Sequence, residues 1–394
     1  MTLPHYDKKL NVRPVAAEDL AQARAVAGRA FGEHCEKWYP EPERTLGGFD
    51  GNGQLVSVLE FQLETLWWGA ARVPGAAVGG VATDPASHGK GCGGALMVHA
   101  IHYLRDQGAC ITPLWPFSFR WYGKFGWACP GPVLQLKVWP DLVRQTGARP
   151  GSIRQATGAD AAAVQRLYTR GARLRNGQTV RSAAYWEKPR TLAQIQVLEG
   201  PRGALRASAQ VSISSRNRTQ GRRVRVREMH GDSFSDQLCL LRSLAELEGI
   251  TLLELNLPAE SPFVHAFAEQ CHMVLSHEGA SRVLDVKRAL EALKAPKDLR
   301  ASFGLEVADW VVQPKKPLAF AVQVEGGEVQ VKEGAGRQAL CCDINTFTRL
   351  YSGGLSTGKA RQLGWLQGGG KAQDAACDAL LHGRVPYRSE VEMG

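Results

Sequence analysis

The 394-residue sequence lacks the features that mark a secreted or membrane-spanning protein. Its start, from Met1 to Arg13, is polar and charged, and no uninterrupted apolar run approaches the roughly 18 residues of a membrane-crossing helix. Its nine cysteines contain no Cys-x-x-Cys pair and are odd in number, which argues against a disulfide framework and a zinc ribbon. We therefore expect a cytoplasmic protein with no membrane contact. Its cysteines should be small buried hydrophobic residues, with Cys92 as the candidate reactive exception.

Aromatic residues are missing from the most basic stretch, RNRTQGRRVRVR at residues 216–227, in a chain of net charge +10. Nucleic-acid surfaces usually interleave stacking aromatics with basic side chains, so we expect no nucleic-acid partner. Val224 and Val226 alternate with arginines, which predicts a strand with one apolar face and one arginine face. We expect the arginine face to contact solvent or another subunit.

Glycine is concentrated in a loop between a strand that ends near Thr83 and a helix expected over residues 95–107. The loop reads His88-Gly89-Lys90-Gly91-Cys92-Gly93-Gly94. A helix N-terminus presents free backbone N–H groups and a dipole that favours anions, and glycines let phosphate oxygens approach the backbone. The stretch therefore predicts a pyrophosphate-binding loop. The alternative is that the loop is a tight turn with a purely structural role and binds no ligand.

Spacing separates three kinds of phosphate loop that this stretch could form. A dinucleotide fold matches residues 89–94 formally, but it needs an acidic residue about 20 positions later, and residues 110–114 contain none. A Walker-type loop needs Ser or Thr after its lysine, whereas Gly91 follows Lys90. The remaining pattern is Gln/Arg-x-x-Gly-x-Gly/Ala of the GNAT acetyltransferases. The loop resembles that pattern, with His88 in the first place.

An aromatic segment with one tyrosine follows the next strand. Tyr122-Gly123-Lys124-Phe125-Gly126-Trp127 resembles the Tyr-x-x-Phe-Gly-Phe/Tyr signature of GNAT enzymes, in which the tyrosine lies beside the CoA sulfur. A phenol, with an ordinary pKa near 10, can donate a proton to the departing thiolate. The alternative is that Tyr122 is one aromatic packing residue among several. No metal is expected, because His99 and His102 have no further ligand cluster nearby.

The chain is long enough for two or three domains, because single cores rarely extend beyond about 250–300 residues, and it contains an internal repeat. Arg13 followed by Asp19 recurs 141 positions later as Arg154 followed by Asp160. We therefore expect two copies of one strand-and-helix plan.

The second copy lacks the chemistry of the first. The same offset aligns Tyr122 with Phe263, which has no proton to donate, and places the acidic stretch 228–236 where the first copy has its glycine loop. This copy should not bind CoA.

A different pattern begins near residue 299. Alternating apolar residues at 318–324 and 329–331 around Gly326-Gly327 predict a two-stranded hairpin. A strand at 341–344 and helices around 345–351, 358–366 and 372–381 follow. Together they indicate an α+β domain of roughly a hundred residues.

The whole arrangement resembles the Eis (enhanced intracellular survival) family of acetyltransferases. Arg181-Ser182-Ala183-Ala184-Tyr185-Trp186 resembles that family's central Arg-Ser-x-x-Tyr/Trp-Trp segment, and DINTFTRLYSG at 343–353 resembles its sterol-carrier-protein-like domain. The resemblance implies an α/β and α+β fold with two tandem GNAT-like domains. These are a catalytic domain at 1–150 and a degenerate one without the CoA loop at 151–290, followed by a sterol-carrier-protein-like α+β domain at 291–394.

The resemblance also implies acetyl-CoA as the acetyl donor and assigns site residues. CoA contacts become Val81, Ala82 and Thr83 on the strand, Gly89, Lys90, Gly91, Cys92, Gly93 and Gly94 in the loop, and Phe117 and Ser118 before the tyrosine. The family uses its terminal carboxylate as a base, which makes Gly394 the catalytic counterpart of Tyr122. That family commonly ends in an acidic residue and phenylalanine, whereas this chain ends Glu392-Met393-Gly394. Glu390, Glu392 or a disordered tail are the alternatives.

The expected function is acetyl transfer from acetyl-CoA to a primary amine of a cationic, aminoglycoside-like or polyamine-like small molecule. By resemblance the enzyme is a homo-oligomer, a hexamer. The alternative is a lipid-binding or partner-binding protein that acts through its C-terminal domain. That domain shows no long apolar lining in its sequence.

Overall fold

The computed structural model describes residues 6–7, 9–32, 40–214, 221–267 and 271–393, and the chain forms two compact units. The first unit contains residues 1–66, 71–130 and 279–383, and the second contains 67–70, 131–278 and 384–394. No helix in the described ranges combines the length and apolar character that crossing a membrane requires.

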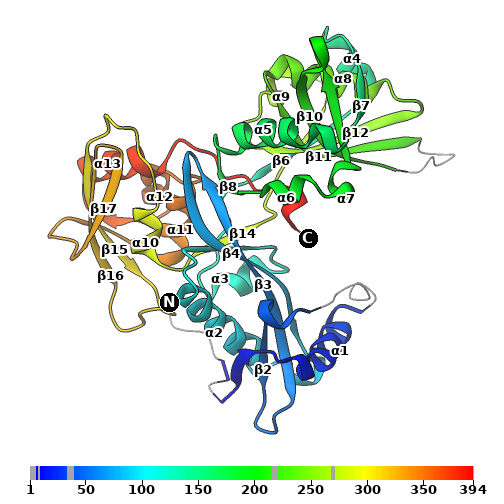
Figure 1. Cartoon of the computed structure of the whole chain (residues 1–394). Helices are drawn as coiled ribbons and strands as arrows, with labels where there is room; N and C mark the ends of the chain where they lie inside the picture. Colours follow the sequence, from blue (N-terminus) through cyan, green and yellow to red (C-terminus); the bar gives the residue numbers. More distant parts are fainter. Residues whose placement is uncertain (1–5, 8, 33–39, 215–220, 268–270, 394) are drawn as a thin grey trace. The chain divides into compact units, whose positions relative to one another are not determined.

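The N-terminal part of the first unit is a sheet with helices packed against it (Figure 1). Its elements are β1 (Asn11–Pro14), α1 (Leu20–Phe31), β2 (Thr45–Phe49), β3 (Leu55–Trp68), β4 (Ala71–Thr83), α2 (Cys92–Asp106), β5 (Ile111–Leu114), α3 (Phe119–Gly123) and β14 (Ala280–Val283). The strand order is β1-β2-β3-β4-β5-β14. Figure 1 shows α1 and α2 flanking the strands, and each helix has its own core: Ala23 of α1 packs near Val58, and Ala95 of α2 packs near Val56.

Strands β4 and β5 are parallel neighbours along the four residues of β5. Their pairing runs from Gly75 opposite Ile111 to Val78 opposite Leu114, and β4 then continues to Thr83 without β5 beside it. Strand β5 therefore ends before the last residues of β4, where the CoA contacts are expected.

The C-terminal part of the first unit is the expected α+β domain. Its elements are α10 (Val286–Glu291), β15 (Ala301–Ala308), β16 (Leu318–Glu325), β17 (Glu328–Glu333), β18 (Ala339–Asp343), α11 (Ile344–Ser352), α12 (Thr357–Gln362), β19 (Gln367–Gly368) and α13 (Lys371–Leu381). The hairpin prediction is confirmed: β16 and β17 are antiparallel, and Gly326 and Gly327 form the turn with positive φ. Helix α12 ends earlier than expected, because Gly364 adopts a left-handed conformation just beyond it.

The second unit is built around a sheet of order β13-β6-β12-β11-β10-β9-β7. Its elements are β6 (Val133–Val138), α4 (Pro140–Gln145), β7 (Ile153–Gln155), α5 (Ala161–Ala172), β8 (Asn176–Thr179), α6 (Ala183–Trp186), α7 (Pro189–Leu192), β9 (Ile195–Glu199), β10 (Leu205–Ile213), β11 (Arg222–Gly231), α8 (Phe234–Ala245), β12 (Ile250–Pro258), α9 (Phe263–Ala266), β13 (His272–Ser276) and the 3₁₀ turn η7 (Glu390–Met393). Leu240 and Leu244 of α8 and Val224 and Val226 of β11 are fully buried in its core.

The repeat is visible in the local structure of both halves. Arg13 donates to the Asp19 carboxylate at 2.7 Å, and Arg154 donates to the Asp160 carboxylate at 2.6 and 2.9 Å. Each carboxylate also accepts the backbone N–H three residues before it, at the start of a helix. These arginine hydrogen bonds hold the pKa of both carboxyl groups below their usual values. The tandem plan expected from the sequence is therefore present.

The two compact units do not follow the three expected segments 1–150, 151–290 and 291–394. Strand β6 comes from the first segment but pairs with β12 and β13 in the second sheet. Strand β14 comes from the second segment but pairs with β5 in the first sheet. The sheet of each half thus includes strand residues from the other half, and the last residues of the chain join the second unit. Sequence periodicity identifies strands, whereas the sheet that a strand joins depends on contacts distant in sequence.

Candidate active site

The glycine loop leads directly into α2, three residues earlier than the sequence predicts. The helix begins at Cys92, and Gly91 stands before it with a φ of 84°. Cys92, Gly93 and Gly94 therefore form the first turn, whose amide N–H groups have no carbonyl acceptors within the helix. Free N–H groups at a helix start are the kind of backbone donors that can bind an anionic group.

Two of the loop glycines make contacts that a side chain would prevent. A Cβ on Gly91 would lie 2.7 Å from the Asp7 nitrogen, and a Cβ on Gly93 would lie 2.9 Å from Thr83 Oγ1. The same Cβ on Gly93 would lie 3.5 Å from the Trp121 ring. The first turn of α2 thus lies against both the end of β4 and the residue that precedes Tyr122.

The expected strand contacts, Val81 to Thr83, form the last residues of β4. Ala82 is buried, and Val81 and Thr83 are half-buried. The His88 Nε2 atom lies 3.1 Å from the Thr83 carbonyl oxygen. His88, which departs from the family pattern, therefore contacts the end of the strand from the start of the loop, next to the first turn of α2.

Tyr122 lies in the short helix α3 and is only 3% exposed. Its ring packs edge-on against three aromatic rings, with centroid distances of 5.3 Å to Phe117, 4.7 Å to Trp121 and 6.2 Å to Trp127. Burial raises the pKa of the Tyr122 phenol well above its ordinary value. The hydroxyl therefore stays protonated through the neutral range and is available as a proton donor.

The two residues predicted ahead of the tyrosine have different environments. Phe117 is 72% exposed, although its ring contacts Tyr122 and Trp121. Ser118 is the N-cap of α3, and its Oγ accepts the Trp121 N–H at 3.2 Å. Ser118 thus fixes the start of the helix that carries the tyrosine.

The expectation that Cys92 is a reactive thiol is wrong. The side chain is buried against Leu10 and Val56, and burial raises the pKa of the thiol. A raised pKa reduces the thiolate fraction, so Cys92 belongs with the other buried cysteines. Among the described residues, no group of three or more His, Cys, Asp or Glu side chains is arranged to hold a metal ion.

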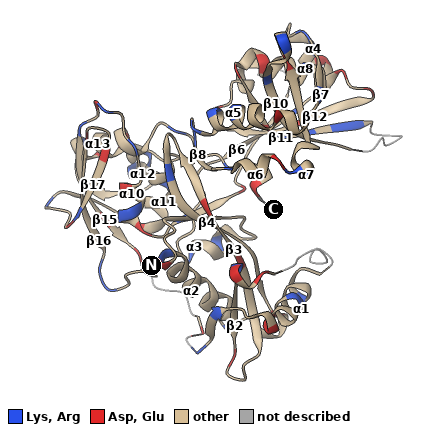
Figure 2. Cartoon of the chain, in the orientation of Figure 1, with Lys and Arg blue, Asp and Glu red and all other residues tan. Residues whose placement is uncertain are grey.

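Two carboxylates near the end of the chain accept hydrogen bonds from side chains of the second unit. The first of them is Glu390. It accepts from Arg225 at 2.6 Å and from Arg227 at 3.0 Å, and Asn256 donates to it at 3.4 Å. Strand β11 carries several basic residues (Figure 2), and its arginine face was expected to contact solvent or another subunit. Two of its arginines instead bind the chain's own C-terminal segment. Arg216 and Arg218 lie outside the described residues.

The second carboxylate is Glu392, whose side chain is 4% exposed. It accepts from Arg181 at 3.0 Å, from the Tyr168 hydroxyl at 2.8 Å and from the Thr179 N–H at 3.0 Å. Arg181 opens the central Arg-Ser-x-x-Tyr-Trp segment, and it also binds both oxygens of the buried Glu228 at 2.7 and 2.8 Å. Gly394, the residue predicted to supply the catalytic carboxylate, lies outside the described residues.

The sequence does not reveal these contacts, although it contains part of the signal. Arg181 belongs to a recognisable motif, and the arginines of β11 form a visible charge cluster. Neither pattern specifies which carboxylate binds, because Glu390 and Glu392 lie more than 160 residues away in sequence from Arg181 and from the arginines of β11. Paired acidic residues close to a chain end, together with an unexplained arginine strand, are the signal that could have suggested them.

The second half has a different structure where the first has its glycine loop. Helix α8 starts after Ser233, whose Oγ accepts the Asp236 N–H at 3.1 Å. Asp236 is 3% exposed and forms an ion pair with Arg206. A carboxylate therefore already lies at this helix N-terminus, where it would repel a phosphate.

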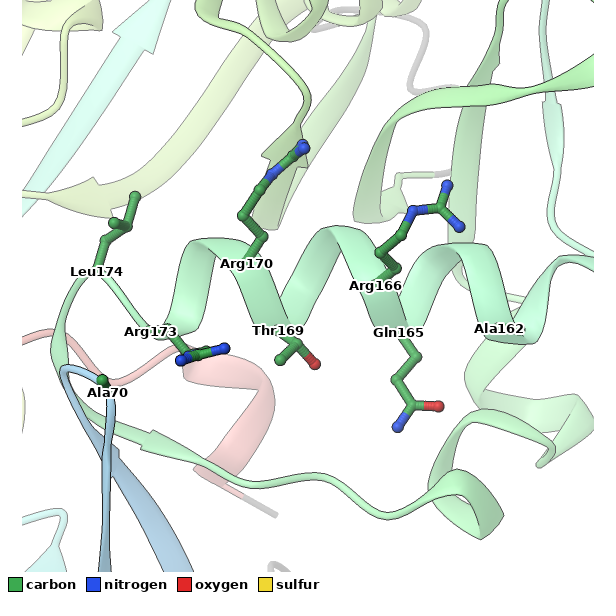
Figure 3. A pocket seen from close by; sticks show the side chains of 8 residues that line it. All are labelled: Ala70, Ala162, Gln165, Arg166, Thr169, Arg170, Arg173 and Leu174. Carbon is green, nitrogen blue, oxygen red and sulfur yellow. The ribbon is translucent and has the colours of Figure 1, made fainter.

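A hollow of about 680 Å³ lies along α5 in the second unit (Figure 3). It is lined by Ala70, Ala162, Gln165, Arg166, Thr169, Arg170, Arg173 and Leu174. Figure 3 shows Arg166 and Arg170 on one side of the helix and Gln165 and Thr169 on the other. The hollow contains none of the residues predicted for the active site.

Comparison with known families places two domains on the chain. The family described as acetyltransferase (GNAT) domain matches residues 11–129, and the family described as sterol carrier protein domain matches residues 286–389. No curated protein sequence matches the chain.

Solved structures show the same fold along nearly the whole chain. A GCN5-related N-acetyltransferase from Anabaena variabilis is 20% identical with a TM-score of 0.83, over 96% of this chain and 99% of its own. One from Kribbella flavida is 21% identical with a TM-score of 0.79, over 96% and 97%. Eis1 from Mycobacterium abscessus is 20% identical with a TM-score of 0.73, over 96% and 99%. The fold expected from the resemblance, tandem GNAT-like halves with a sterol-carrier-protein-like domain, is confirmed.

Proposed function

Since this chain carries an acetyltransferase (GNAT) domain at residues 11–129 and a sterol carrier protein domain at residues 286–389, we propose that it transfers acetyl from acetyl-CoA to a primary amine. One observation supports this most directly: the first turn of α2 contacts both Thr83 and Trp121, the neighbour of Tyr122. The glycine loop and the end of β4 therefore lie beside Trp121, whose ring packs edge-on against Tyr122 at 4.7 Å. These are the parts needed to hold a CoA thioester and to protonate its sulfur.

Each part has a role in the proposed reaction. The N–H groups at the start of α2 bind the pyrophosphate, and the backbone of Val81 to Thr83, beyond the end of β5, binds the extended pantetheine arm. The amine attacks the thioester carbonyl, so that a C–N bond forms and the C–S bond breaks. Tyr122 donates its proton to the departing thiolate, and a base takes a proton from the amine.

The base that we propose is the terminal carboxylate of Gly394. Glu390 and Glu392 are less suitable, because each is already bound by arginine side chains in the second unit. A carboxylate held by guanidinium hydrogen bonds is not free to contact an amine. The contacts of these two residues hold the segment 390–392 within the second unit.

The acceptor that we propose is a cationic small molecule with a primary amine, of aminoglycoside-like or polyamine-like chemistry, and the enzyme is a homo-oligomer, a hexamer by resemblance. A panel of such amines incubated with acetyl-CoA, with free thiol release as the readout, tests the acceptor class. Acetylation confined to neutral amines would contradict it.

A carboxylate added to the loop is expected to weaken acetyl-CoA binding tenfold or more. Gly89 has a φ of 77°, and a Cβ added there would meet no heavy atom within 4 Å, so Gly89→Glu adds charge without a clash. Like-charge repulsion at the pyrophosphate then opposes binding. Isothermal titration calorimetry with acetyl-CoA provides the dissociation constant.

Gly108→Glu is the matched control for this variant. Gly108 follows the other end of α2, has a φ of 93° and likewise has open space around it. Both variants carry similar backbone strain, but only Gly89→Glu places charge at the loop. Equal affinity of the two variants, or a wild-type protein that does not bind acetyl-CoA, would contradict the proposal.

Because the terminal carboxylate is the proposed base, moving it is expected to lower kcat about tenfold or more without changing the affinity for acetyl-CoA. Adding one glycine after Gly394 shifts the carboxylate by one residue, whereas Gly394→Ala leaves it in place and serves as the control. Steady-state kinetics and calorimetry measure the two quantities. Unchanged kcat in the extended chain would remove the terminal carboxylate from the mechanism.

A further inference from the structure

The segment after Tyr122 presents three consecutive carbonyl oxygens to side chains from outside the GNAT motif. Asn345 Nδ2 donates to the Gly123 oxygen at 3.1 Å, and Trp310 Nε1 donates to the Lys124 oxygen at 2.7 Å. Arg282 Nε donates to the Phe125 oxygen at 2.7 Å. We name Arg282, Trp310 and Asn345 the donor triplet.

Two members of the donor triplet belong to the sterol carrier protein domain, which matches residues 286–389. Trp310 follows β15 and is 6% exposed, and Asn345 lies in the first turn of α11. Asn345 is part of the DINTFTRLYSG segment, to which the sequence assigns no role. All of these residues belong to the same compact unit as Tyr122.

The third member, Arg282, is fully buried on β14 and is itself held in place. Its Nη2 donates to both oxygens of Asp309 at 2.8 and 2.9 Å, and Asp309 also accepts the Val311 N–H at 3.1 Å. Gly126 follows the three carbonyls with a φ of 96°, and a Cβ there would lie 2.8 Å from Arg282 Nε. The glycine of the Tyr-x-x-Phe-Gly-Trp segment thus permits the close approach of the arginine.

Helix α3 has only five residues, too few to be stable by itself. Ser118 caps its start, and the backbone carbonyl oxygen of Tyr122 accepts the Phe125 N–H at 2.9 Å within the segment. The next three carbonyls accept hydrogen bonds from the donor triplet. The position of the Tyr122 ring is therefore set from both ends, and the downstream end is set by the donor triplet.

We propose that the sterol carrier protein domain serves the acetyltransferase site by positioning Tyr122, with Trp310 and Asn345 as positioning residues. The inference rests on the proposed function of Tyr122 as the proton donor. A displacement of about 1 Å in a reacting group can lower a rate about 10²-fold. The domain then acts through hydrogen bonds to the backbone, without contacting substrate.

The test removes single donors and asks whether the effect passes through Tyr122. Trp310→Phe and Asn345→Ala are each expected to lower kcat about tenfold or more and to leave the KM for acetyl-CoA unchanged. In a Tyr122→Phe background the same changes should alter kcat less than about twofold, because residues that act through one group are not additive. Trp365→Phe, in the same domain at a side chain 42% exposed, is the matched control.

Amide hydrogen exchange of the peptide that contains residues 118–127 provides a readout independent of turnover. Both variants should exchange faster there than wild type and Trp365→Phe. Wild-type kcat and exchange in both variants, or equal kcat losses in the two backgrounds, would overturn the inference. A wild-type protein without acetyl-CoA-dependent acetylation would instead overturn the proposed function, and the exchange rates alone would then decide whether the donor triplet holds the segment.

Discussion

Tyr122→Phe is expected to lower kcat by about 10²–10⁴-fold, the usual contribution of general acid catalysis. The change removes one hydroxyl from a ring that is 3% exposed and packed among three aromatic rings, so packing should be retained. Because burial raises the pKa of this phenol, the wild-type rate should show no loss from Tyr122 ionisation as pH rises through its ordinary pKa near 10. Steady-state kinetics with acetyl-CoA and a primary amine, repeated across pH, measures both effects.

Tyr103→Phe is the matched control for the loss of the hydroxyl. Tyr103 lies on α2 in the same domain, and its ring packs edge-on against Phe61 at 5.5 Å. The chemical change is identical, but this residue is not part of the proposed site. If Tyr122→Phe retains kcat within about twofold, or if the control loses as much, the phenol is not the proton donor.

Arg181→Met is expected to lower the free energy of unfolding by about 3–5 kcal/mol, the range measured when one member of a buried ion pair is removed. Arg181 is 7% exposed as a residue, and its guanidinium binds Glu228 and Glu392 and lies 3.9 Å from the centre of the Tyr168 ring. The variant leaves the buried Glu228 without its guanidinium and leaves Glu392 with only the longer 3.6 Å ion pair to Arg388. Denaturant unfolding at neutral pH measures the loss.

The loss of unfolding free energy in Arg181→Met should become smaller in acid. The direction follows from the lowered pKa of Glu228. Burial alone raises the pKa of this carboxyl, but Arg181 and the neighbouring His230 bring it down to about 2 from an ordinary value of 4.5. A lowered pKa stabilises the folded state above pH 4.5, and this contribution is lost as pH falls from 4.5 towards 2. The wild-type protein should therefore lose stability over this pH range. The difference in unfolding free energy between wild type and Arg181→Met should become smaller.

Arg170→Met supplies the comparison for an exposed ion pair. Arg170 pairs with Asp232, and their side chains are 49% and 42% exposed. Exposed pairs usually contribute about 0–1 kcal/mol, so this variant should unfold close to wild type. A similar loss in both arginine variants, or an Arg181→Met difference that stays constant from about pH 7 to about pH 2, would contradict the role assigned to the buried network.

Local features of the sequence predict much of the site. The spacing of the glycines and the lysine in the loop excludes two other phosphate loops, and the structure shows Gly91 with positive φ directly before α2. The repeat is recognisable from Arg13 with Asp19 and from Arg154 with Asp160, and both pairs form. In each case the interacting residues lie close together in the chain, so backbone geometry fixes most of the arrangement.

Contacts between distant residues could not be predicted in this way. Strands β6 and β14 each join the sheet of the other half, and nothing local to either strand shows it, because a strand's pattern indicates which face is buried and not which edge it joins. The arginines of β11 are visible as a cluster, while their ligand Glu390 lies 163 and 165 positions away.

The sequence by itself determined the repeated plan, the glycine loop before α2 and the tyrosine segment, since each is encoded by residues close together in the chain. Only the tertiary structure decided what surrounds them: the buried pairing of Arg181 with Glu228 and Glu392, and the three donors that reach the carbonyls after Tyr122. The physical reason is that a guanidinium or an indole N–H can donate to any suitably placed acceptor. Its partner depends on which segments folding brings within about 3 Å.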